Sequence, residues 1–264
     1  MGDHDEGMTV RAVKTAGIDL AASAPGTALA IIEWGEWGAR LSSVDVGVGD
    51  GEIVTAVADC AMVGIDCALG WPDDFVEFVG RHARGERVDQ SHDEGIAWRR
   101  RLAYRETDRD IHARTGKLPL SVAADRLGLT AMHCVVLLDL LGEQRGGAVD
   151  RSGRGGVVEV YPGATLRVWG FERRGYKKDA GVRDALLASI EVDAPWLDLA
   201  GHRERLLSSD DAFDAFIAAL AARAHERGLT PPIPREHEDR ASREGWIAVP
   251  EGRLADLGPA REMV

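Results

Sequence analysis

Two aspartates in a repeated five-residue frame give the strongest chemical signal in the sequence. Residues 17–21 read GIDLA and residues 64–68 read GIDCA. Each frame lies in a short apolar run, which is typical of a strand covered on both faces of an α/β sheet. An ionised carboxylate there loses on the order of several kcal/mol of hydration unless a positive group compensates. Asp19 and Asp66 therefore predict one shared partner, most simply a divalent cation. The alternative is that each aspartate only caps the turn after its strand.

Three further acids extend this pattern. Asp211 and Asp214 share one face of a helix predicted over 210–227, and that face continues in alanines, which favours close burial against a sheet. Alternatively, acids in a first turn only offset the helix dipole. Glu159 lies inside the apolar run 157–162.

Together these acids form a set of hard oxygen ligands that suits Mg²⁺ or Mn²⁺. Two such ions can activate a water and stabilise the leaving oxygen in phosphodiester hydrolysis. The candidate catalytic residues are Asp19, Asp66, Glu159, Asp211 and Asp214. The candidate metal ligands are Asp19, Asp66, Asp211 and Asp214.

The elements that must position these acids are predicted from apolar runs and turn signals. The predicted strands are 16–22, 27–34, 40–46, 61–69 and 157–162. The first three strands form an antiparallel meander, and a helix over 52–60 brings the fourth strand in parallel beside the first. We therefore expect an α/β fold with a mixed five-stranded sheet, with Asp19 and Asp66 on adjacent strands. Residues 1–13 are predicted to be a disordered tail, 14–264 a single domain, and about 73–145 a helical insertion over the acidic edge.

Arginines cluster inside that insertion. A helix predicted over 96–113 carries Arg101, Arg105 and Arg109 at four-residue steps, so that they face one way and are candidate substrate-binding residues. Asp108 lies beside them, so an ordinary intrahelical ion-pair face is the alternative. The basic segment 173–178 is a second candidate. Either surface would contact phosphates without reading sequence.

Composition limits the classes of function. The formal net charge of −12 over 264 residues argues against broad, non-specific nucleic-acid binding, although a local basic groove remains compatible with it. No apolar run approaches the roughly 18 residues of a membrane span, and the first nine residues lack the apolar segment of a signal peptide. Three cysteines without paired spacing indicate free thiols. We expect a cytoplasmic protein without a membrane partner.

The order of strands and acids resembles the RNase H-like fold, and the pair Asp211-x-x-Asp214 is similar to that of RuvC-type resolvases. Five short motifs in order resemble the domain-of-unknown-function family 429, over about residues 14–251. They are residues 17–21, 65–72, 105–109, 159–162 and 244–247. The resemblance implies an RNase H-like nuclease acting on DNA or RNA, with Asp19, Asp66 and either Asp211 or Asp214 holding metal. Glu159 has no equally firm counterpart in the wider fold.

Two other functions remain open at this point. The same fold could serve as a non-catalytic binding module in which the acids are structural. A nucleotide-binding phosphotransferase of the sugar-kinase and actin group also starts with an acid on a strand, but it needs a glycine-rich phosphate hairpin that residues 20–23 do not supply. The sequence contains no P-loop, no G-x-S-x-G and no H-E-x-x-H motif. Oligomeric state is not predicted.

Overall fold

The computed structural model describes residues 12–87, 95–123 and 127–259. The disordered tail predicted for residues 1–13 falls almost wholly outside these ranges, except that Val13 already begins the first strand.

A mixed sheet of six strands forms the centre of the described chain, in the order β5-β4-β1-β2-β3-β6. The strands are β1 (Val13–Asp19), β2 (Ala28–Trp34), β3 (Ala39–Val46), β4 (Met62–Asp66), β5 (Val157–Glu159) and β6 (Leu197–Asp198). β1, β2 and β3 are an antiparallel meander, and β4 runs parallel to β1, as predicted. The sequence predicted five strands. The sixth, β6, pairs with only two residues of β3 and is too short to produce a readable alternation.

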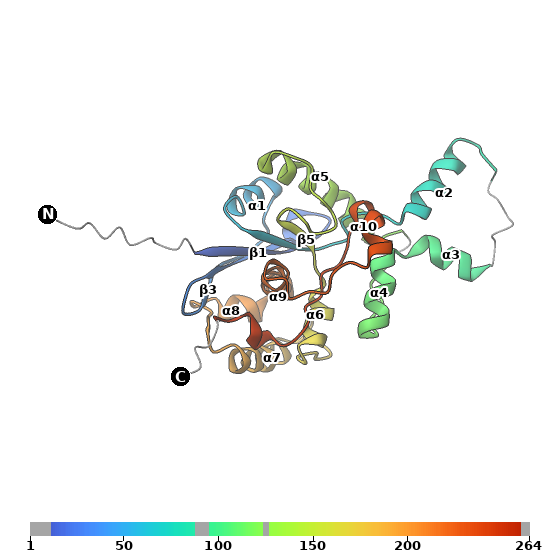
Figure 1. Cartoon of the computed structure of the whole chain (residues 1–264). Coiled ribbons are helices and arrows are strands. Elements are labelled where there is room, and N and C mark those ends of the chain that lie inside the picture. The colour runs from blue at the N-terminus through green and yellow to red at the C-terminus, as the bar shows by residue number, and fades with distance from the viewer. Residues whose placement is uncertain (1–11, 88–94, 124–126, 260–264) are drawn as a thin grey trace.

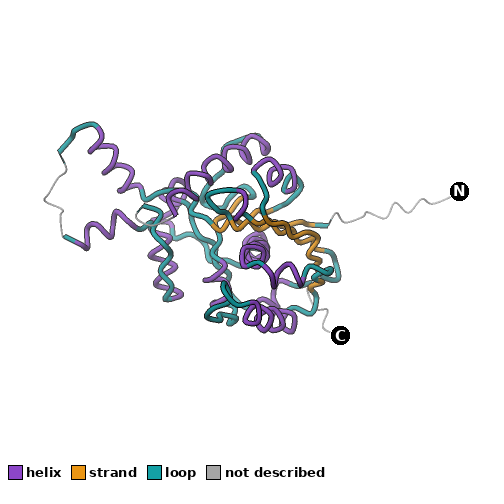
Figure 2. Tube along the Cα trace, turned by 180° about the vertical axis from the view of Figure 1, so that it is seen from behind, coloured by secondary structure: helices purple, strands orange, loops and turns teal. Residues whose placement is uncertain are grey.

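Helices cover both faces of this sheet (Figure 1). They are α1 (Asp50–Ala56), α2 (Asp73–Ala83), α3 (Ile96–Ala103), α4 (Glu106–Thr115), α5 (Leu127–Arg145), α6 (Pro162–Val168), α7 (Ala180–Asp193), α8 (Arg203–Ser208), α9 (Asp210–Glu226) and α10 (Glu238–Glu244). Short 3₁₀ turns lie at η1 (Ala24–Gly26), η3 (Arg235–His237) and η4 (Leu254–Leu257). α1 and α5 lie on one face, while α6 to α9 lie on the other, with α9 directly against the strands (Figures 1 and 2).

Helix α5, the last part of the predicted insertion, packs on the sheet as part of the covering layer. Cys134, Leu137 and Leu141 pack with α1 and with the strand residues Ile18 and Ile65 in one core cluster. By length and composition this 19-residue helix could cross a membrane. Its packing on the sheet instead makes it a core helix of a soluble-type α/β fold.

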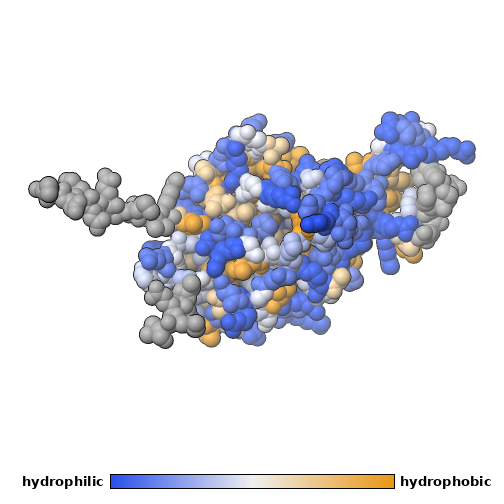
Figure 3. All heavy atoms as spheres, viewed as in Figure 1, coloured by the Kyte–Doolittle hydropathy of each residue, from blue (hydrophilic) through white to orange (hydrophobic). Residues whose placement is uncertain are grey.

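The remaining part of the predicted insertion projects from the sheet as an arm of α2 and α3, followed by α4 (Figures 1 and 2). The rings of Phe78 and Trp98 join α2 to α3 edge to face, with centroids 5.8 Å apart. The prediction of one helix over 96–113 is wrong. Tyr104 has extended backbone angles, so the chain breaks between α3 and α4. The visible face of the arm around α2 is strongly hydrophilic (Figure 3).

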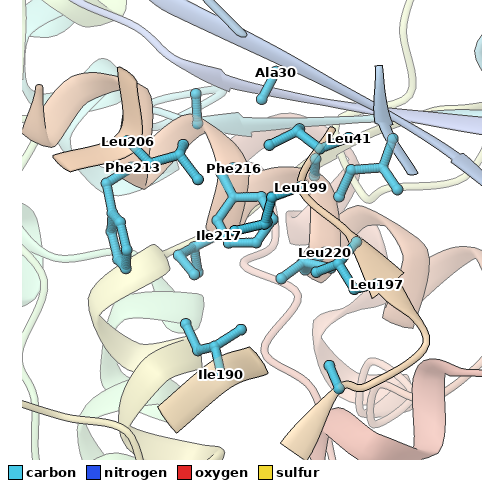
Figure 4. Close-up of a cluster of buried hydrophobic side chains, with 14 of the residues drawn as sticks. Ala30, Leu41, Ile190, Leu197, Leu199, Leu206, Phe213, Phe216, Ile217 and Leu220 are labelled. Atoms are coloured by element: carbon cyan, nitrogen blue, oxygen red, sulfur yellow. The ribbon is translucent and has the colours of Figure 1, made fainter. Parts of the chain in front are cut away.

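Helix α9 is buried almost all round, as its sequence predicts. Its bulky stripe, which includes Phe213, Phe216 and Leu220, faces a cluster with Leu41 of β3 and Ile190 of α7 (Figure 4). The opposite, alanine-rich face lies on the sheet. This helix is therefore a central layer between the strands and the outer helices.

The two glycines of the repeated frame explain how close α9 lies. A Cβ atom on Gly17 would come within 2.1 Å of the Ala215 carbonyl oxygen, and one on Gly64 within 2.8 Å of the Ala218 oxygen. Gly17 and Gly64 are paired in register on β1 and β4. Only residues without a side chain allow the helix backbone to approach both strands at this point.

We expect Gly17→Ala to lower the free energy of unfolding by about 1–3 kcal/mol or more, because a methyl group meets helix backbone that cannot move aside. Urea denaturation followed by circular dichroism measures this. Gly51→Ala in α1 is the matched control, since nothing lies within 4 Å of a Cβ there, and it should be neutral or stabilising by up to about 1 kcal/mol. Equal stability of both variants would contradict the close-packing explanation.

Candidate active site

Asp19 and Asp66 lie opposite each other at the carboxyl ends of the adjacent parallel strands β1 and β4. Residues paired in this way are about 4.8 Å apart at their backbones and project from the same face of the sheet. That face is the α9 face, because side chains two residues apart share a face and Gly17 and Gly64 both meet α9. Both aspartates are half-buried. The prediction that they lie on adjacent strands is confirmed.

The first turns of α9 bring two further acids to the same place. Ser209 caps the helix by accepting a hydrogen bond from the Ala212 amide at 3.1 Å. Asp214 is only 1% exposed, while Asp211 is half-buried. α9 runs antiparallel to β1, since Thr15 near the start of the strand donates to the Ala219 carbonyl at 3.0 Å. The acidic end of the helix therefore lies beside the strand ends that carry Asp19 and Asp66.

A loop before α7 places two polar side chains on Asp214. The Tyr176 hydroxyl donates to Oδ1 at 2.9 Å, and the Lys177 ammonium lies 2.6 Å from Oδ2. Buried Arg183 holds this loop, donating to the Tyr176 carbonyl at 2.6 Å and to the Leu207 carbonyl at 2.7 Å. The site thus contains a cation, Lys177, and Arg183 holds the loop that carries this lysine.

Burial and mutual repulsion raise the pKa values of the acids. For Asp19 the causes are loss of hydration, then the charges of Asp66 and Asp214, while Lys177 acts in the opposite direction. Loss of hydration also raises the pKa of Asp66, and the charge of Asp214 raises it further. Burial likewise raises the pKa of Asp211 and of Asp214. These four carboxyl groups form one electrostatically coupled cluster with more negative charge than Lys177 can neutralise.

Glu159, the fifth predicted catalytic acid, has a different position. Its register partner on β4 is Ile65, whose side chain packs toward α1 and α5, so Glu159 leaves the sheet on the face opposite Asp66. The carboxylate is 2% exposed and is held by Arg105 through two hydrogen bonds of 2.7 Å and by the Leu69 amide at 3.0 Å. These contacts pair Glu159 with Arg105. Because Glu159 also lines one cavity with Asp19 and Asp66, its catalytic role stays a prediction.

Arg105 is buried, but it lines the same cavity as Asp19 and Asp66, so its role in substrate binding stays a prediction. Besides Glu159, its guanidinium donates to Asp108 at 2.9 Å and to the Glu244 carbonyl at 3.0 Å. The Glu244 carboxylate in turn accepts the Asp73 amide that begins α2, at 2.9 Å, and the Glu106 amide that begins α4, at 3.1 Å. Three motifs distant in sequence, at 105–109, 159–162 and 244–247, thus meet in one buried ion cluster.

The other two candidate substrate-binding arginines do not share a surface with each other. Arg101 is exposed on α3, whereas Arg109 lies on α4 beyond the break at Tyr104. The Arg109 guanidinium lies 2.6 Å from Glu106 and donates to the Tyr104 carbonyl at 2.7 Å. The predicted row of Arg101, Arg105 and Arg109 therefore does not exist, because it assumed one continuous helix.

A cavity of about 400 Å³ opens over the acids. Asp19 and Asp66 lie in its wall, together with Lys117, Tyr161 and Lys177. Tyr161 and Tyr176 are not among the predicted site residues, and Lys177 was predicted only as part of the basic segment 173–178. The available signal for Tyr161 was its place two residues after Glu159, inside the motif 159–162.

The donor chemistry of this cluster fits a hard divalent cation, since carboxylate oxygens are the ligands that Mg²⁺ and Mn²⁺ prefer. Within the ranges that the structure describes, however, no group of three or more His, Cys, Asp or Glu side chains is assembled for a metal ion. The Lys177 ion pair occupies one oxygen of Asp214. Asp19 and Asp66 are consequently the acids best placed to receive a cation.

Comparison with known proteins places the chain in an uncharacterised group. A family model described as "Protein of unknown function (DUF429)" matches residues 17–239. No curated protein and no solved structure matches the chain. The matched range includes both aspartate frames, the Arg105 motif, the Glu159 motif and all of α9.

We expect Arg105→Met to lower the free energy of unfolding by about 3–5 kcal/mol, because it leaves the buried Glu159 and Asp108 carboxylates without their cation. Arg109→Met is the matched control, since the half-exposed pair with Glu106 should contribute less than about 1 kcal/mol. Urea denaturation compares the two. Similar losses in both variants would mean that the buried cluster is not a structural element.

We expect the metal-free protein to lose stability between pH 5 and pH 9. Because the folded state raises the pKa of Asp19 and Asp66, it binds more protons than the unfolded chain. That stabilisation is complete below about pH 4 and is lost as pH rises through the raised values. Urea denaturation in the presence of a chelator measures the trend. Asp19→Asn should flatten it, and a wild-type stability that increases over this range would refute the coupled cluster.

Proposed function

We propose that the chain, which belongs to the DUF429 family, is a cytoplasmic nuclease that hydrolyses phosphodiester bonds of DNA or RNA with Mg²⁺ or Mn²⁺. The observation that carries the proposal is the pairing of Asp19 with Asp66, in register on adjacent parallel strands, beside the acids of α9. An acidic cluster without a cation is costly, since burial and repulsion both oppose ionisation. A bound divalent ion would remove that cost.

The topology supports the same proposal. The core order β5-β4-β1-β2-β3, with β2 as the antiparallel strand, is the order of the RNase H-like fold. Asp19 ends the first strand, Asp66 ends the fourth, and Asp211 and Asp214 begin a late helix. Fold alone does not establish an activity, so the proposal depends on the acids that this fold brings together.

Each residue has a defined task in the proposed reaction. Asp19 and Asp66 would hold the cation, and Asp211 and Asp214 would complete its surroundings. When bound, the cation would activate water and neutralise charge developing on the phosphate. Tyr176 orients Asp214 through its hydroxyl, and Arg183 holds the Tyr176 loop in place. Lys177, which lines the cavity beside Asp214, would contact a phosphate oxygen of the substrate.

A non-catalytic binding module is the second candidate, and one observation favours it. Lys177 already pairs with Asp214, and the described residues contain no assembled group of three metal-ligand side chains. In that case the lysine and protonation of Asp19 or Asp66 would balance the cluster without a metal. The two candidates differ in whether Asp19 is needed for cation binding and for turnover.

We expect wild-type protein to bind Mn²⁺ in calorimetric titration and to hydrolyse bis(p-nitrophenyl) phosphate when Mn²⁺ is present. Asp19→Asn should weaken Mn²⁺ binding by at least about tenfold and abolish hydrolysis, because it removes a ligand. Asp45→Asn, an exposed acid on β3, is the matched control and should change neither. Negligible Mn²⁺ binding by wild type and variant alike, with no hydrolysis, would instead support the binding module.

A further inference from the structure

The cavity over the acids has walls of two kinds. Asp19 and Asp66 come from the strand ends, and Lys177 lies on Asp214 beside them. A second wall, formed by Pro119, Leu120 and Leu127, comes from the segment between α4 and α5 and from the first residue of α5. One wall carries carboxylates and a lysine, and the other is apolar. Such a pair of walls suits a ligand with a phosphate and a planar apolar part.

Leu120 is the most informative residue of the apolar wall. Its side chain is 60% exposed although it lines a cavity, and it belongs to none of the core clusters of the described residues. Burial of such a side chain gains free energy only when a ligand covers it. Leu120 is therefore the side chain of this wall that a ligand bound in the cavity would cover.

Two lysines line the same cavity, besides Arg105, and each is held by a carboxylate. Lys117 is 2.6 Å from Glu172, and Lys177 is 2.6 Å from Asp214. Tyr161 and Tyr176, both half-buried, line the space as well. Lysines beside tyrosines are a combination with which proteins hold single-stranded nucleic acid, with the cations on phosphates and the aromatic rings on bases.

The volume sets the size of the ligand. About 400 Å³ is near the lower end of the roughly 300–1,000 Å³ range of pockets that enclose one small molecule. An intact double helix cannot bring a base edge and a scissile phosphate into such a space, since its bases are stacked inside the duplex. Enzymes with pockets of this kind act on unpaired nucleotides or extrude one. The net charge of −12 further disfavours a long phosphate-tracking surface.

We infer that this cavity binds one unpaired nucleotide of a single-stranded substrate, with the phosphate at Asp19 and Asp66 and the base against Leu120. The inference rests on the proposed function for the identity of the acidic site. It adds a substrate class, single strands over duplexes, and a specificity-determining residue, Leu120.

Fluorescence anisotropy of labelled DNA tests the inference with the full chain in Ca²⁺, a cation with the same oxygen ligands. The probes are a ten-nucleotide single strand and a covalently closed duplex that contains the same sequence. We expect the single strand to bind at least about tenfold more tightly. Equal or tighter binding of the closed duplex would overturn the inference.

Leu120→Ala should weaken binding of the single strand by about five- to tenfold, the order of magnitude of one lost base contact. Leu129→Ala is the matched control, because Leu129 is 69% exposed on α5 and does not line the cavity. It should leave binding unchanged. Equal effects of the two variants would overturn the role of Leu120.

Hydrolysis of the same two probes in Mn²⁺ separates this inference from the proposed function. Leu120-dependent binding of the single strand without cleavage supports the nucleotide pocket and contradicts the nuclease. Cleavage of the closed duplex as fast as of the single strand supports the nuclease and contradicts the pocket. Cleavage of the single strand alone supports both.

Discussion

The close contact between α9 and the strands β1 and β4 is the constraint on which the rest of this structure depends. The helix backbone lies where any Cβ atom on Gly17 would clash at 2.1 Å and where Gly64 leaves similarly little room. Since side chains alternate along a strand, the residue two places after each glycine must also face the helix. The contact therefore fixes the fold and the acidic site together. Asp19 and Asp66 are directed toward the start of α9 by the same geometry that packs its middle.

A second buried interaction holds the part of the molecule that surrounds the site. Arg105 binds Glu159 on the edge of the sheet, and Glu244 holds the amides that begin α2 and α4. Buried ion pairs contribute little net stability, but they are costly to break singly. Here the ion pairs fix the relative positions of α4 and β5, because Arg105 binds both Asp108 and Glu159.

The acidic site itself is balanced between two ways of neutralising its charge. As the structure stands, Lys177 and the raised pKa values of the aspartates limit the repulsion. A divalent ion would do the same more completely, and the lysine would contact a phosphate oxygen of the substrate. The cavity above the acids joins this charged surface to an apolar wall that includes the exposed Leu120. A site arranged in this way can combine phosphate chemistry with recognition of a base.

The sequence by itself determined the sheet core, the late buried helix and the acids at the strand ends, because apolar runs, turns and repeated frames are local signals. The structure confirms the adjacency of Asp19 and Asp66, and the alanine face of α9 lies on the sheet as predicted. Only the tertiary structure showed that Glu159 and Arg105 are paired with each other. Sequence periodicity does not give strand register, and the register of β5 places Glu159 on the face of the sheet opposite Asp66. Periodicity also does not mark the break at Tyr104 that separates Arg101 from Arg105 and Arg109. The aromatic and leucine lining of the cavity was likewise invisible, since those residues meet only when α4, α5 and the Tyr176 loop are assembled.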